Sequence, residues 1–235
     1  MQHPENPKLF RMKQLLTLCL LLGSLAAPLH AQQPSATARS MAKQGLVDIH
    51  ELAPDIPVSL MYARADNFTG KVLYKDLKEA YLHPKAAKAL AKAQQILKKS
   101  HPELTLKVYD AARPMHIQQI MWNVVAGTPK NIYVSNPKNG GGMHNYGMAV
   151  DLTLADAKGD SIPMGTLIDH LGPAAHIDKE ALLVQKKVIS AEAKRNRELL
   201  RSVMKQAGFK PLRTEWWHFN LISRAQAKAY YKPIK

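Results

Sequence analysis

The sequence predicts an α+β fold: a single domain in which helices pack on a central, mainly antiparallel sheet. Three segments carry this prediction. Residues 84–99 are rich in Ala, Leu, Lys and Gln and place Leu90 and Leu97 on one helical face, as an amphipathic helix does. Residues 104–109 and 150–154 alternate apolar and polar side chains, which is typical of half-buried strands.

The first 31 residues are expected to be a signal peptide. Lys8, Arg11 and Lys13 form a basic start, and residues 15–27 form an apolar run that ends in small residues. A run of this length is too short to cross a hydrocarbon layer of about 30 Å as a helix. With cleavage after Ala31, we expect a periplasmic or secreted protein with no stable membrane span.

The rest of the chain divides into a lead-in and a domain. Residues 32–44 begin with a polar stretch that contains Pro and Ser, and they are expected to be flexible. Residues 45–235 are long enough for one domain with a sizeable core. The single cysteine, Cys19, falls in the signal segment, so the mature chain is expected to lack disulfides and Cys-ligated zinc.

The charge balance is strongly basic, with 33 Lys and Arg against 18 Asp and Glu, a formal net charge of +15. Such a balance can indicate nucleic acid or another anionic partner. Many of the lysines, however, lie in residues 84–99, where they form the solvated face of the predicted helix. No basic stripe interleaved with aromatic residues is present, so we expect no nucleic-acid partner. The oligomeric state cannot be read from these patterns.

The remaining elements follow the same patterns. Pro84 suits the first turn of the helix that it begins, and Gly208 suits the end of a later one. The other expected elements are short extended pieces at 46–62, helices at 115–125 and 192–206, a hairpin tip at 156–160, and a strand at 216–221.

Candidate chemistry centres on Gly142-Met143-His144-Asn145-Tyr146-Gly147-Met148-Ala149-Val150-Asp151. Asn145 and Gly147 are residue types that tolerate a positive φ, so the chain can turn sharply between His144 and Asp151. Histidine and aspartate are zinc ligands, and this pair would make half of a site. Glu215-Trp216-Trp217-His218 is the obvious source of the rest.

A catalytic zinc commonly has three protein ligands, here His144, Asp151 and His218. Glu215 would then act as general base, with the two Trp residues beside it raising its pKa by excluding water. Spacing alone leaves open that these histidines are structural. Arg113, before Pro114 at the end of a predicted strand, could stabilise an oxyanion or equally form a structural ion pair.

Together these motifs resemble the D-alanyl-D-alanine dipeptidases of the VanX type, zinc metallopeptidases of family M15 that share a fold with DD-carboxypeptidases and the Hedgehog signalling domain. Four ordered motifs over most of the mature chain carry the resemblance: Tyr62-Ala63-x-x-Asp66-Asn67-Phe68-Thr69-Gly70, Asp110-x-x-Arg113-Pro114, His144-x-x-Gly147-x-Ala149-x-Asp151 with Glu215-Trp216-Trp217-His218, and Met164-Gly165-Thr166-x-x-Asp169. The family often has Ser where this chain has Gly142, and an aromatic-containing version of the segment before Arg113.

The resemblance implies a single Zn²⁺ per chain, held by His144, Asp151 and His218. It implies that Glu215 is the general base and that Arg113 stabilises the transition state. It also implies that Tyr62 and Asp169 bind the free ammonium of a small dipeptide substrate. The implied function is hydrolysis of D-Ala-D-Ala or a close dipeptide in cell-wall turnover. The alternatives are a peptidoglycan DD- or LD-carboxypeptidase and a non-catalytic cell-wall-binding domain that keeps zinc for structure.

Overall fold

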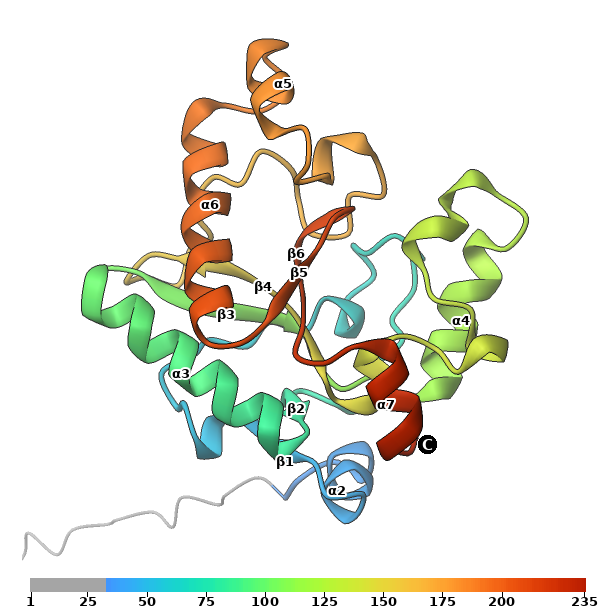
Figure 1. Ribbon diagram of the computed structural model, residues 1–235. Coiled ribbons are helices and arrows are strands. Elements are labelled where there is room, and N and C mark those ends of the chain that lie inside the picture. Colours follow the sequence, from blue (N-terminus) through green and yellow to red (C-terminus); the bar gives the residue numbers. More distant parts are fainter. Residues whose placement is uncertain (1–32) are drawn as a thin grey trace, which may run out of the picture. The chain divides into compact units, whose positions relative to one another are not determined.

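The computed structural model describes residues 33–235, which are built around a four-stranded antiparallel sheet (Figure 1). The strand order is β3–β4–β6–β5, and the strands are β3 (Thr105–Asp110), β4 (Ala149–Ala155), β6 (Glu215–Asn220) and β5 (Lys210–Leu212). A second, two-stranded sheet pairs β1 (Val47–Asp48) with β2 (Tyr81–Leu82). The predicted α+β class and the mainly antiparallel sheet are confirmed.

Two long helices pack against each other and against the sheet on one side: α3 (Pro84–Ser100) and α6 (Ala191–Gln206) (left in Figure 1). Both occur where the sequence predicts them. The two ends of α6 have local causes. The Ser190 hydroxyl caps its start by accepting from the Ala193 amide at 2.9 Å, and Gly208 follows its end with a φ of 105°.

The other helices are α2 (Ala36–Lys43), α4 (Met115–Val125), α5 (Glu180–Gln185) and α7 (Arg224–Tyr230). Helix α4 lies on the side of the sheet away from α3 and α6 (right in Figure 1). The C-terminal tail connects the start of α4 to the turn at residues 143–146. The Ile234 carbonyl accepts from the Met115 amide at 2.9 Å, and the Ile234 amide donates to the Asn145 carbonyl at 2.7 Å. Among the helices of residues 33–235, none is both long and apolar enough to cross a membrane.

The expectation of a flexible lead-in at residues 32–44 is wrong for most of its length. Helix α2 occupies residues 36–43, and the Ser35 hydroxyl caps it by accepting from the Ala38 amide at 3.0 Å. Ala38 and Met41 are three residues apart, so they share a helical face, and both are buried in the core. The polar composition hides this short apolar pair. The predicted signal peptide, residues 1–31, lies outside the described residues.

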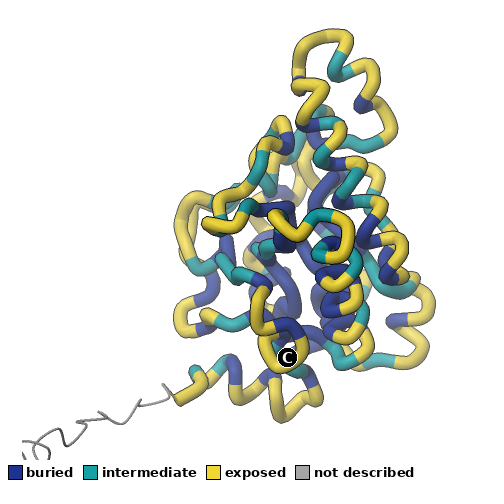
Figure 2. The backbone as a smooth tube through the Cα atoms, turned by 90° about the vertical axis from the view of Figure 1, so that its left-hand side faces the viewer, coloured by how far each residue is buried: buried dark blue, intermediate teal, exposed yellow. Residues whose placement is uncertain are grey.

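Strand β4 is buried along its whole length rather than half-buried. Its apolar residues pack into the core, and its polar residues Asp151 and Thr153 are also covered, at 3 % and 1 % exposed. In Figure 2 the dark blue, buried backbone is concentrated in the centre, and the end of the molecule that carries α5 is mostly exposed. A charged side chain buried at the centre of a sheet requires a partner, so Asp151 must be paired with other polar groups or with an ion.

Candidate metal centre and active site

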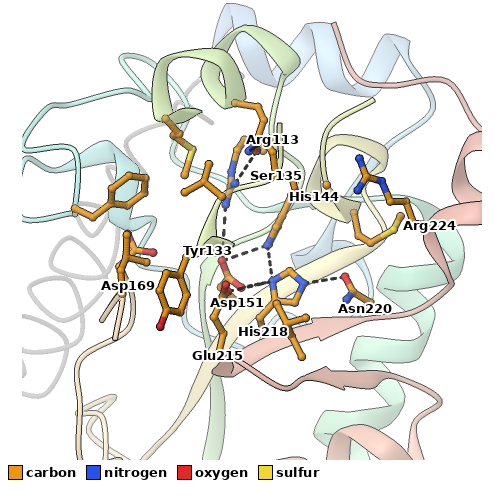
Figure 3. Close-up of a pocket in the computed structure, with 18 of the residues that line it drawn as sticks. Arg113, Tyr133, Ser135, His144, Asp151, Asp169, Glu215, His218, Asn220 and Arg224 are labelled. Carbon is orange, nitrogen blue, oxygen red and sulfur yellow. Dashed lines mark hydrogen bonds and ion pairs between the residues drawn. The ribbon is translucent and has the colours of Figure 1, made fainter. Parts of the chain in front are cut away.

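Two neighbouring strands and one turn bring three ligand-type side chains together (Figure 3). Asp151 of β4 lies directly opposite His218 of β6, so their side chains share one face of the sheet. His144 arrives from the 3₁₀ turn η5 (Met143–Tyr146), which Gly147 ends with a φ of 64°. Asn145, which the sequence suggested as a second positive-φ residue, is helical, and its side-chain amide instead donates to the Arg113 carbonyl at 2.8 Å.

The donor atoms of these residues converge. His144 Nε2 lies 3.1 Å from His218 Nδ1 and 3.2 Å from Asp151 Oδ2, and His218 Nδ1 lies 3.0 Å from Asp151 Oδ1. All three side chains are buried. Among residues 33–235 this is the one group of His, Cys, Asp or Glu side chains arranged to hold a metal ion.

The outer ring nitrogens settle which atoms face inward. His144 Nδ1 lies 2.7 Å from the Ala111 carbonyl, and His218 Nε2 lies 2.8 Å from Asn220 Oδ1. Both partners are acceptors, so both outer nitrogens donate, and in the neutral form of each ring the inner nitrogen presents a lone pair. Three acceptors that converge in a buried space fit a bound cation, and histidine ligands anchored in this way are typical of metal centres.

The charge of Asp151 is stabilised by the same neighbours. Burial works against its ionisation, but positive charge and hydrogen bonds from protonated His144 and His218 hold the pKa of this carboxyl well below its usual range, and a bound cation would act in the same direction beside neutral rings. The group therefore offers a carboxylate rather than a neutral acid across the physiological pH range.

Arg113 lies beside the centre as a fixed fork. Its Nε donates to Asp110 Oδ2 at 2.9 Å, Nη2 contacts the same carboxylate, and Nη1 donates to Gln118 Oε1 at 2.9 Å. Nη2 also lies 3.8 Å from Asp151 Oδ2, and the guanidinium stacks on the Tyr62 ring at 5.1 Å. Burial opposes its charge, but Asp110, together with Tyr62, Tyr74 and Asp151, more than compensates and holds the pKa of Arg113 well above its usual value.

Glu215 faces the same cavity because the sheet is irregular. Residues three apart on a regular strand would point to opposite faces, but the register between β5 and β6 shifts, with Pro211 opposite Phe219 and Leu212 opposite Glu215. Glu215 Oε2 thereby lies 3.9 Å from His218 Nδ1. Burial raises the pKa of Glu215 to about 8.

The two Trp residues lie behind the site rather than in its wall. Trp216 donates from Nε1 to Thr166 Oγ1 at 2.8 Å, and its ring meets that of Trp217 edge-on with centroids 5.5 Å apart. Both are almost fully buried, and neither lines the cavity that holds Glu215. Their contribution is therefore a rigid apolar support for this strand.

At the other end of the cavity, Asp169 holds an unpaired oxygen. Tyr62 donates its hydroxyl to Asp169 Oδ1 at 2.9 Å, whereas Oδ2 is buried with no hydrogen-bond partner among the described residues. Asp169 also has a φ of 65°, which is costly for a residue with a side chain. Burial raises the pKa of this carboxyl to about 7. A strained, half-satisfied carboxyl at a cavity wall indicates a site for a cationic group.

All seven residues predicted from the sequence line one cavity of about 330 Å³. The seven are Tyr62, Arg113, His144, Asp151, Asp169, Glu215 and His218. Sequence reasoning missed the residues that hold these in place, above all Asp110, Gln118 and Asn220. Asp110 was visible as part of the arginine motif, but nothing in the sequence pointed to Gln118 or Asn220.

A family model described as D-ala-D-ala dipeptidase, of peptidase family M15, matches residues 42–235. The chain belongs to this family of metallopeptidases. It is 37 % identical over 180 residues to the D-alanyl-D-alanine dipeptidase of Escherichia coli (strain K12), covering 77 % of this chain and 86 % of the relative. It is 25 % identical over 215 residues to that of Enterococcus faecium, covering 81 % and 98 %. It is 29 % identical over 202 residues to the D-alanyl-D-alanine dipeptidase of Streptomyces coelicolor, covering 78 % of this chain and 94 % of the relative.

One departure of this M15 peptidase from the family pattern has a structural explanation. Gly142 has an extended backbone (φ −108°) that any residue could adopt. A Cβ placed there would lie 2.8 Å from Ser135 Oγ and 3.2 Å from Ser135 Cβ, which is too close. The side chain of Ser135 therefore fills the space beside Gly142, and a larger residue at 142 would have to displace it.

Proposed function

We propose that this peptidase is a zinc-dependent dipeptidase that hydrolyses D-Ala-D-Ala or a close dipeptide. The observation that carries the proposal is the convergence of three buried acceptors, on His144, Asp151 and His218, in one cavity with Glu215 and Arg113. The relatives named as D-alanyl-D-alanine dipeptidases support this substrate.

Zinc is the metal that the ligand set favours. Two histidines and one carboxylate make a known catalytic zinc set, and one position is left for the reaction. A single Zn²⁺ held by His144, Asp151 and His218 would supply Lewis-acid chemistry at the peptide bond. The other groups needed for hydrolysis are side chains of this protein that line the same cavity.

Glu215 is suited to move the proton. Its carboxylate lies on the edge of the metal group, and burial favours its neutral form, so it can take a proton from the attacking water and hold it. It would then deliver this proton to the leaving amine as the C–N bond breaks. The same carboxyl thus serves as base and then as acid.

Arg113 is suited to stabilise the oxyanion. Asp110 and Gln118 fix its guanidinium, so it does not need to reorganise when negative charge develops on the carbonyl oxygen. A planar fork with donors in fixed directions provides this stabilisation better than a flexible ammonium would.

Asp169 and Tyr62 are suited to bind the substrate's free amino terminus. The unpaired Asp169 Oδ2 offers an acceptor for an ammonium, and Tyr62 holds the carboxyl in place through its hydroxyl. A buried carboxyl at this end of the cavity would anchor a free amino terminus and so fix how much chain precedes the scissile bond. This feature favours a dipeptidase over a carboxypeptidase that acts on longer, blocked peptides.

We also propose that the protein is exported and acts in cell-wall peptide turnover, in the periplasm or outside the cell. The support is the basic start and apolar run of the first 31 residues. Sequencing the amino terminus of the protein recovered from the periplasmic and cytoplasmic fractions checks this point. Periplasmic protein that starts at Gln32 supports export, and cytoplasmic protein that still starts at Met1 refutes it.

Release of D-alanine from D-Ala-D-Ala and from its N-acetylated form tests the proposed function. Wild type and Glu215→Ala are compared at equal zinc content. We expect hydrolysis of the free dipeptide only, and its loss in Glu215→Ala. Cleavage of the N-acetylated peptide would instead indicate a carboxypeptidase, and failure to cleave either would favour a binding role.

A further inference from the structure

The cavity has a basic end as well as an acidic one. Asp169 and Arg224 lie on opposite sides of the His144, Asp151 and His218 group (Figure 3). The carboxylates that line the cavity are Asp151, Asp169 and Glu215, and none of them is paired with Arg224. Charge is therefore separated along the cavity, with the metal group between the two ends.

Arg224 is held at its position without being neutralised. Its Nη2 donates to the Asn139 carbonyl at 2.7 Å, which uses one of its five N–H groups. Within residues 33–235, no carboxylate forms an ion pair with it. A guanidinium that is tethered through a carbonyl retains its full positive charge and has donors left for a ligand.

Ser135 contributes a free hydroxyl to the same wall. Its carbonyl accepts from Gln118 Nε2 at 2.8 Å, and Gln118 accepts from Arg113, so the residue is linked to the centre by a chain of hydrogen bonds. Its hydroxyl has no hydrogen-bond partner among the described residues and lines the cavity. The absence of a side chain at Gly142 gives this hydroxyl its room.

The chain from Ser135 to Gly142 connects these features, because it supplies Ser135, the Asn139 carbonyl that holds Arg224, and the glycine that makes space. We propose that Ser135 and Arg224 bind the terminal carboxylate of the substrate. This inference rests on the proposed dipeptidase function and deepens it. A dipeptide backbone spans about 7 Å when extended, so anchors for both of its charged ends would select a free, zwitterionic dipeptide.

The test compares D-Ala-D-Ala with its C-terminal amide, D-alanyl-D-alaninamide, as substrates for the zinc-loaded full chain. Wild type is expected to prefer the free acid. Arg224→Gln is expected to lose about 10-fold in kcat/KM for the acid, mainly through KM, and to keep its activity on the amide. Ser135→Ala is expected to shift the preference in the same direction by a smaller factor.

A matched control comes from the same helix. Lys228 is one turn after Arg224 and does not line the cavity, so Lys228→Gln removes the same charge and should leave the acid-to-amide ratio unchanged. Lys210 does line the cavity. If Lys210→Gln abolishes the preference and Arg224→Gln does not, the assignment of Arg224 is overturned.

A pair of substitutions tests the role of Ser135 independently of the charge. Gly142→Ser alone should impair cleavage, because its Cβ would press on Ser135. Adding Ser135→Gly should relieve this contact, return a hydroxyl from position 142, and restore the preference for the acid. Equal impairment in the double variant would overturn the assignment of Ser135.

The outcomes also separate the two proposals. If wild type cleaves the acid and the amide equally well, the carboxylate assignment fails and the dipeptidase function stands. If wild type cleaves neither, the proposed function fails, and the carboxylate assignment fails with it.

Discussion

The inner ring nitrogens of His144 and His218 face each other at 3.1 Å, beside the carboxylate of Asp151. When both rings are neutral, these nitrogens are two acceptors at hydrogen-bond distance, and they repel each other. The arrangement is held from outside, through the Ala111 carbonyl and Asn220 Oδ1. A bound cation would convert this repulsion into binding energy.

Asn220→Ala should weaken metal binding although Asn220 is not itself a ligand. The substitution removes the acceptor that fixes the proton of His218 on Nε2, so the ring can turn or change tautomer. Loss of such a partner typically costs 10- to 100-fold in metal affinity, and we expect about that here. Competition with a chromogenic zinc chelator measures the affinity. Asn123→Ala, on the exposed face of α4, serves as the control. Equal affinities for Asn220→Ala and wild type would contradict the role of Asn220.

Asp110→Asn should impair both catalysis and stability. Asp110 is fully buried, where it holds Arg113 and also accepts from the Tyr74 hydroxyl at 2.7 Å. Its loss leaves a buried guanidinium without its main counter-charge, and breaking such a pair costs about 3 kcal/mol or more. We expect the urea concentration at the midpoint of unfolding to fall accordingly. We also expect kcat for D-Ala-D-Ala to fall more than KM rises, because Asp110 no longer fixes the orientation of the Arg113 guanidinium. An unchanged kcat would contradict the oxyanion role of Arg113.

The stability of the metal-free protein should fall as pH rises. Burial raises the pKa of Glu215 to about 8 in the folded state, far above its value in an unfolded chain. The folded state therefore binds the proton more tightly, and stability is lost as pH rises from about 4.5 to about 8, at about 1.4 kcal/mol for each unit of pKa shift. Asp169, with its pKa raised to about 7, acts in the same direction.

Glu215→Gln isolates the first of these contributions. The variant cannot lose a proton at this position, so its free energy of unfolding should vary less with pH, and it should be more stable than wild type at pH 8.5. Urea unfolding of both metal-free proteins at pH 5.5 and pH 8.5 measures the difference. Parallel pH profiles would show that Glu215 titrates normally.

Much of this arrangement could be predicted from the sequence, where local pattern is sufficient. Apolar periodicity located the helices α3 and α6. The spacing of His144, Asp151 and His218 alone left a structural role open, and the resemblance of four ordered motifs to the D-alanyl-D-alanine dipeptidases indicated the metal group. What could not be predicted depends on contacts between distant segments. Ser135 filling the space beside Gly142 and Asn220 orienting His218 follow from the folded geometry, which residue types do not reveal.

Two other features escaped prediction for related reasons. One is the register shift between β5 and β6: the sequence motif predicts Glu215 and His218 at one site, but a regular strand would place them on opposite faces. Helix α2 rests on just two buried apolar side chains, Ala38 and Met41, within a polar segment. In each case a tertiary contact outweighs the local pattern.

Zinc titration of the metal-free protein, with release of D-alanine from D-Ala-D-Ala as the readout, tests the central claim most directly. Activity should be absent without metal and should rise in proportion to added zinc until one equivalent per chain is bound. His218→Ala should remain inactive at the same zinc concentrations. Full hydrolysis by thoroughly chelated wild-type protein, or by zinc-treated His218→Ala, would contradict a metal centre built from His144, Asp151 and His218.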